Sequence, residues 1–97
     1  MKNNFLELIQ NTNGRIFTVA FFKRSGGLRV MNCRLGVIKG LKGVGQKYNP
    51  LDKGLITVWD MQKEAYRNIN LECIVSAKID GIEYLNENLL EDIKRML

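Results

Sequence analysis

The hydrophobic pattern divides the chain into a short helix, a series of strands and a second helix. The apolar residues of positions 5–9 fall on one helical stripe before the turn-forming residues 11–14, which predicts a helix within residues 1–13. From residue 15 the pattern changes to runs rich in aromatic and β-branched residues, which are typical of strands. The predicted strands are residues 16–22, 28–35, 55–61, 66–71 and 74–79, and residues 82–85 could extend the sheet as an edge.

The last segment, residues 86–97, predicts an amphipathic helix. Asn86 is a suitable N-cap, acids come early in the segment, and Lys94 and Arg95 come late, as the helix dipole favours. The apolar residues form one stripe along this helix: Leu89, Leu90, Ile93, Met96 and Leu97.

Short consecutive strands without a βαβ crossover predict a small, curled antiparallel sheet or barrel. The barrel would span residues 15–80, and 97 residues are the size of one domain. We therefore expect a single mainly β domain over residues 1–97, flanked by the two helices.

Residues 36–54 are predicted to form a long loop, because glycines and Pro50 interrupt any regular element. The spacing of Gly40, Gly43 and Gly45 lacks the strand-to-helix context of a phosphate-binding fingerprint.

Composition argues against most catalysis. The chain has no histidine, the commonest general base and zinc ligand. Cys33 and Cys73 lack a CxxC spacing and cannot complete a four-thiolate zinc site. We therefore expect both cysteines to have reduced thiols and to pack as small apolar side chains. We predict a non-enzymatic protein with no metal and no cofactor. Without an apolar leader or a run of about 18 apolar residues, we expect it in the cytoplasm and not in a membrane.

Charge is distributed unevenly along the chain. Residues 15–53 carry nine lysines and arginines against one acid, a net charge of +8, whereas residues 54–97 carry −3. This asymmetry favours a polyanion-binding face on the first hairpin and the loop, with Tyr48 as a base-stacking residue. The alternative is a solvated basic surface without a ligand. The candidate nucleic-acid-binding residues are Arg29, Arg34, Lys39, Lys42, Lys47, Tyr48, Lys53 and Arg67.

Three further side chains carry predictions from their position in the strands. Phe21 and Phe22 are adjacent, so in a strand they point to opposite faces and one of them must leave the core. That side chain could pack under a terminal helix, fill an oligomer interface or form a base-stacking platform, and we expect packing or an interface rather than stacking. Asp60 ends a strand, where we expect its carboxylate to accept hydrogen bonds from turn amides.

Two segments resemble a known family: residues 28–35, and residues 58–74 with their Val-Trp-Asp and Tyr-Arg strands. The similarity, over about residues 17–80, is to small phage and bacterial proteins of a second WYL type with a Sm-like SH3 β-barrel. The resemblance implies a five-stranded antiparallel SH3-like barrel. The arginines of larger WYL domains bind nucleic acid or nucleotides; Arg67 matches the first of them, whereas Asn70 and Cys73 replace the others.

The leading functional hypothesis is a phage-type accessory protein that binds nucleic acid without sequence preference. The alternative is a protein-interaction module, either an inhibitor of a host factor or a phage assembly component, that uses the last helix and an open sheet edge. A homo-oligomer and a small-nucleotide module are further alternatives.

Overall fold

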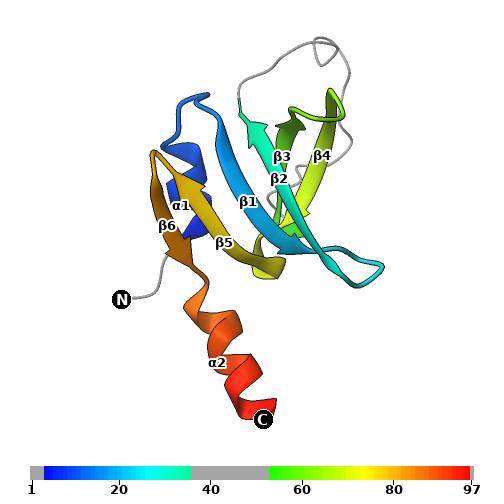
Figure 1. The fold of residues 1–97 in the computed structure, drawn as a ribbon, viewed down its shortest axis with the longest axis vertical. Helices are drawn as coiled ribbons and strands as arrows, with labels where there is room; N and C mark the ends of the chain where they lie inside the picture. The colour runs from blue at the N-terminus through cyan, green and yellow to red at the C-terminus, as the bar shows by residue number, and fades with distance from the viewer. Residues whose placement is uncertain (1–3, 36–52, 97) are drawn as a thin grey trace.

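The computed structural model describes residues 4–35 and 53–96, which form one curled antiparallel sheet with a helix at either end of the chain (Figure 1). The helices are α1 (Phe5–Gln10) and α2 (Glu87–Met96). The strands are β1 (Phe17–Phe22), β2 (Leu28–Arg34), β3 (Leu55–Asp60), β4 (Ala65–Asn70), β5 (Ile74–Ile79) and β6 (Ile82–Leu85), with a 3₁₀ turn η2 (Leu71–Cys73) before β5.

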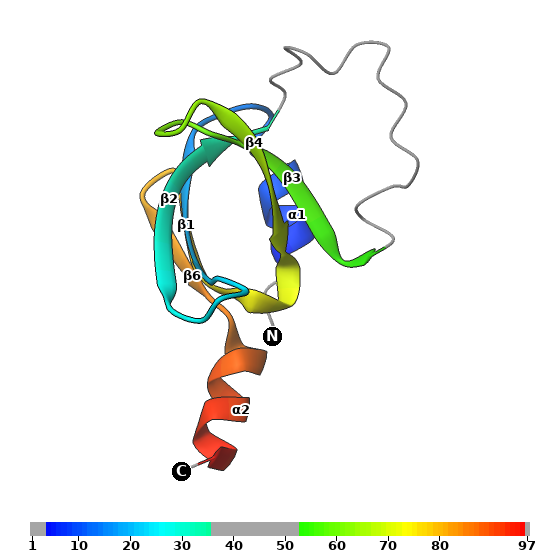
Figure 2. The same cartoon turned by 90° about the vertical axis from the view of Figure 1, so that its right-hand side faces the viewer.

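The sheet has the strand order β4-β3-β2-β1-β5-β6, and every pairing is antiparallel. It curls strongly on itself, as Figure 2 shows. The predicted mainly β, antiparallel fold with two short helices is confirmed, but the five-stranded barrel differs from the structure in two respects. The sheet has six strands, and among the described residues no pairing joins β4 to the β5–β6 side to close it.

The sixth strand forms because the chain reverses tightly after β5. Asp80 and Gly81 both have positive φ angles, 52° and 81°, as the two central residues of a tight hairpin turn require. Ile79 and Ile82 are thereby paired, and residues 82–85 add to the sheet as an edge strand, as the sequence suggested.

The core lies on the concave side of the sheet, where the inward-facing side chains of β1 to β5 meet Phe5 and Ile9 of α1. The alternation along β1 places Phe21 in this core at 5% exposure and leaves Phe22 41% exposed. The two phenylalanines thus confirm the expected split between the faces. The buried apolar residues are Phe5, Ile9, Phe17, Val19, Phe21, Met31, Cys33, Ile56, Val58, Ile69, Ile74, Ala77 and Ile79.

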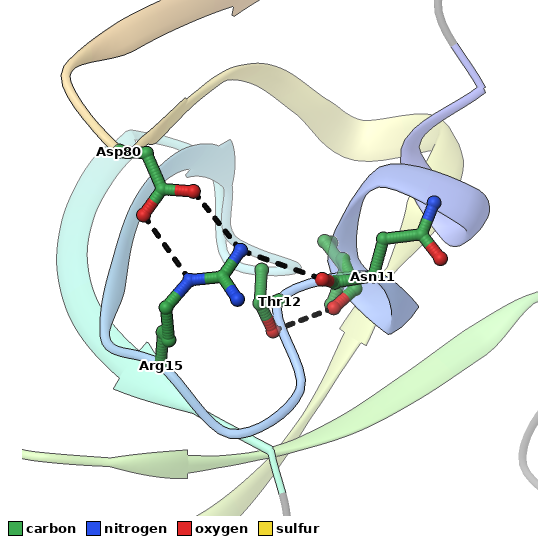
Figure 3. Close-up of polar contacts among 5 residues, drawn as sticks. Asn11, Thr12, Arg15 and Asp80 are labelled. Atoms are coloured by element: carbon green, nitrogen blue, oxygen red, sulfur yellow. Dashed lines mark hydrogen bonds and ion pairs between the residues drawn. The ribbon is translucent and has the colours of Figure 1, made fainter.

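The linker between α1 and β1 contacts the β5–β6 turn through hydrogen bonds (Figure 3). The Arg15 guanidinium donates from Nε to one Asp80 carboxylate oxygen at 3.2 Å and from Nη2 to the other at 2.9 Å. The fully buried Thr12 hydroxyl donates to the Ile9 carbonyl at 2.7 Å. The two Arg15–Asp80 hydrogen bonds join segments 65 residues apart in the sequence, whereas the Thr12 hydrogen bond is local to the end of α1.

The last helix begins where the sequence predicts and extends away from the sheet (Figure 2). The Leu89 backbone N–H donates to Asn86 Oδ1 at 3.2 Å, which confirms Asn86 as the N-cap. The Asn86 amide also donates to the Ile74 carbonyl at 2.6 Å and so ties the start of α2 to the start of β5. None of the helices in residues 4–35 and 53–96 is long and apolar enough to cross a membrane.

Candidate nucleic-acid interface

A pocket of about 560 Å³ lies between the β1–β2 hairpin turn and the edge strand β4. The turn contributes Lys23, Arg24 and Ser25, whereas β4 contributes Arg67 and its neighbours. The end of β1, the start of β3 and Cys73 of η2 complete the lining. The residues that line it are Phe21, Phe22, Lys23, Arg24, Ser25, Leu55, Arg67, Asn68, Ile69, Asn70 and Cys73.

The pocket is electrostatically one-sided. Three cationic side chains, Lys23, Arg24 and Arg67, line it, and no carboxylate is present among its described lining residues. Concave surfaces lined by one sign of charge focus the electric field and concentrate counter-ions. The pocket is therefore suited to an anion.

The β1–β2 hairpin turn exposes Lys23 and Arg24 to solvent. The Lys23 N–H donates to the Gly27 carbonyl and the Gly26 N–H donates to the Lys23 carbonyl, both at 3.0 Å. Gly26 and Gly27 have φ angles of 84° and 87°, which side-chain-bearing residues rarely adopt. The glycines therefore set the turn that leaves Lys23 and Arg24 exposed at its tip.

The third cation, Arg67, lies near the buried carboxylate of Asp60. The Arg67 Nε atom is 3.9 Å from Asp60 Oδ2, which is an ion-pair distance, and the side chain, 35% exposed, also lines the pocket. Arg29 Nη2 donates to the same oxygen at 2.6 Å. One buried carboxylate thus meets two guanidinium groups.

The remaining oxygen of Asp60 organises the β3–β4 turn. Asp60 Oδ1 accepts from the backbone N–H groups of Gln62 at 2.9 Å and Lys63 at 3.1 Å, which confirms the predicted role of this carboxylate. Burial raises the pKa of Asp60, but the amides of Lys63 and Gln62 and the Arg29 guanidinium outweigh it and hold the pKa below 3.8. Asp60 is therefore ionised at neutral pH.

The structure separates the predicted binding residues into several groups. Arg67 lines the pocket, whereas Arg29 is engaged by Asp60 and only 17% exposed. Arg34 is half-buried, with an Nε atom that has no hydrogen-bond partner among the described residues. Lys53 is exposed and lies two residues before the start of β3. Four of the predicted residues lie outside the described residues: Lys39, Lys42, Lys47 and Tyr48.

Lys23 and Arg24 are not among the binding residues predicted from the sequence, and the outward phenylalanine, Phe22, was expected to pack or form an interface rather than to stack on a base. Both cations belong to the segment of +8 charge, but nothing in the local pattern brings their turn close to β4. The available signal was the Gly26-Gly27 turn that follows them, because a tight hairpin displays the charges at its tip.

The two cysteines are free thiols in different surroundings. Cys33 is fully buried, and burial, together with the charge of Asp60, raises its pKa to about 12. Cys73 is half-buried and lines the basic pocket. Only Cys73 is therefore placed to react with a reagent in solution.

Fold and site together define a small, curled antiparallel β domain with a basic pocket beside an open sheet edge. The chain belongs to the family WYL_2, described as having a Sm-like SH3 beta-barrel fold, whose model matches residues 5–75. No curated protein and no solved structure matches the chain significantly.

Proposed function

We propose that this protein binds nucleic acid without sequence preference, through a basic face centred on the pocket between the β1–β2 turn and β4. The observation that carries the proposal is the convergence of Lys23, Arg24 and Arg67 on one concave surface. Phosphate neutralisation of this kind supplies most of the affinity in sequence-independent binding.

The pocket also offers a surface for a base. Phe22 is 41% exposed and lines the pocket beside the turn cations. Aromatic side chains stack on any base, and each stacked base contributes about 1–3 kcal/mol. A single strand can turn a base toward Phe22 while its phosphates lie against Lys23 and Arg24, so we expect single strands to bind more tightly than duplexes.

The test is fluorescence anisotropy with a labelled single-stranded oligonucleotide of mixed sequence. The variant Lys23→Ala/Arg24→Ala should bind at least about fivefold more weakly than wild type at low salt. Each lost phosphate contact should also reduce the slope of log affinity against log salt by about 0.7.

The matched control is Lys63→Ala/Lys78→Ala, which removes the same charge from two exposed lysines that do not line the pocket. This control should bind within about twofold of wild type, because exposed lysines away from the contact contribute only to the distant field. Equal losses in the two double variants would show that net charge and not the pocket governs binding. Absence of binding at low ionic strength would refute the proposal.

A further inference from the structure

Helix α2 carries an apolar stripe that the rest of the described chain does not cover. None of its residues is buried; Leu89 and Leu90 are half-buried, Ile93 is 39% exposed and Met96 is 85% exposed. The helix projects from the sheet in both views of the molecule (Figures 1 and 2). Exposed stripes of this kind mark interaction surfaces.

The charges that flank this stripe on one copy complement those on a second, antiparallel copy. Glu87 lies in the first turn and Lys94 in the last turn, seven residues apart, which is about two turns and places both on the same side of the stripe. When two copies of α2 pack antiparallel about a two-fold axis, Glu87 of each copy faces Lys94 of the other. The helix dipoles then also oppose each other favourably.

A groove at the base of α2 fits the same arrangement. It is a shallow, open groove of about 500 Å³ between α1, η2 and the first turn of α2, and its apolar wall consists of Phe5, Leu6, Leu71 and Leu89. Leu89 belongs to both the groove and the stripe, so the two surfaces are continuous. The groove also has a polar rim: Asn4, Glu72, Asn86 and Asn88.

The opposite end of the stripe supplies a side chain for this groove. Met96 lies seven residues beyond Leu89, a rise of about 10 Å along the helix. In the antiparallel pair, Met96 of one copy therefore lies opposite the first turn of the other, beside the groove. Methionine is unbranched and flexible, and it fills irregular apolar gaps well.

We propose that α2 is a self-complementary docking surface through which two copies of this chain associate as an antiparallel, two-fold symmetric pair. Each copy places Met96 in the groove at the base of the other copy's α2, and Glu87 pairs with Lys94 at both ends. A second copy is the occupant because one chain supplies both complementary charges and both complementary shapes, as an isologous interface requires. Two ten-residue helices form an interface at the small end of the range, so the dimer is concentration-dependent.

Sedimentation velocity on the whole chain tests this arrangement through charge exchange. Wild type should sediment as a dimer at high concentration, whereas Glu87→Lys alone and Lys94→Glu alone should remain monomers, because each places like charges together at both ends. An equimolar mixture of the two variants should form the dimer again, because every Glu then faces a Lys. Loss of helix in either variant cannot produce that recovery, and far-UV circular dichroism records the helix content directly.

A second variant examines the groove. Met96→Ser should raise the dimer dissociation constant at least about fivefold, whereas Lys78→Ala, on β5, should leave it unchanged. A wild type that stays monomeric at about 500 µM would overturn the proposal and leave the stripe to a different protein. A wild-type dimer with a monomeric mixture of the charge variants would overturn the antiparallel arrangement. Glu87, Lys94 and Met96 do not line the basic pocket, so the dimer proposal and the nucleic-acid proposal can be refuted independently.

Discussion

At the scale of single residues, Asp60 links the stability of the fold to the candidate site. Its side chain is 1% exposed. It accepts hydrogen bonds from two backbone amides of the β3–β4 turn and forms ion pairs with Arg29 and Arg67. The turn contacts are local, so the position of Asp60 at a strand end predicts them. The two arginines come from β2 and β4, and no local pattern indicates that they converge on one carboxylate.

The substitution Asp60→Asn should lower the free energy of unfolding by about 2 kcal/mol at pH 7, because the two arginines lose their anionic partner. The pKa of Asp60 is lowered in the folded state, so its charge stabilises the fold above pH 3.8. This contribution disappears as the pH falls from 3.8 through the folded pKa, and the difference between variant and wild type should shrink there. Urea unfolding at a series of pH values measures both effects.

Asp92→Asn, on the exposed face of α2, is the control and should change the unfolding free energy by less than about 0.5 kcal/mol. A deficit in Asp60→Asn that stays constant from pH 7 to well below pH 3.8 would contradict the assigned role of the carboxylate.

At the scale of elements, the sequence predicts what is local and misses what depends on distant pairing. The run from Ile74 to Ile79, bounded by the turn residues after it, has the predicted limits of β5, and Asn86 caps α2 as expected. The order β4-β3-β2-β1-β5-β6 and its open edges depend on pairings between segments far apart in the chain. Periodicity identifies which residues form strands, but it carries no information on whether the first and last strands meet.

The contact between Arg15 and Asp80 is one such distant pairing, and its energy should be small. The two side chains are 50% and 55% exposed, and exposed ion pairs contribute less than about 1 kcal/mol. A double-mutant cycle of Arg15→Ala with Asp80→Asn should give a coupling energy of about 0.5 kcal/mol that falls as salt rises. Asn is the suitable replacement because it tolerates the positive φ of 52° at this position.

Chemical denaturation at low and high salt provides the four unfolding free energies of this cycle. A coupling above about 2 kcal/mol, or one that salt leaves unchanged, would mean that this contact holds α1 far more strongly than its exposure allows.

At the scale of the whole molecule, the basic character of the chain is concentrated by the fold. The sequence has one segment with a net charge of +8 and one with a net charge of −3, which predicts a polyanion site on the first hairpin and the following loop. In the described part of the molecule the hairpin turn and Arg67, which belongs to the acidic segment by sequence, line one pocket. The pocket therefore combines residues that charge counting along the chain had assigned to different halves.

The reactivity of the Cys73 thiol reports on access to this pocket. It lines the basic surface beside β4 and is half-buried, whereas Cys33 is fully buried and its pKa is raised to about 12. A neutral alkylating reagent should therefore modify one thiol of the folded protein, and mass mapping should place it at Cys73.

The most direct test of nucleic-acid binding in the pocket is the rate of Cys73 alkylation with and without a single-stranded oligonucleotide. At a concentration that saturates the anisotropy signal, bound nucleic acid should slow alkylation of Cys73 at least about fivefold, because it covers the pocket entrance. High salt, which releases the strand, should restore the rate. An alkylation rate that does not change when the oligonucleotide is bound would contradict a nucleic-acid site in this pocket.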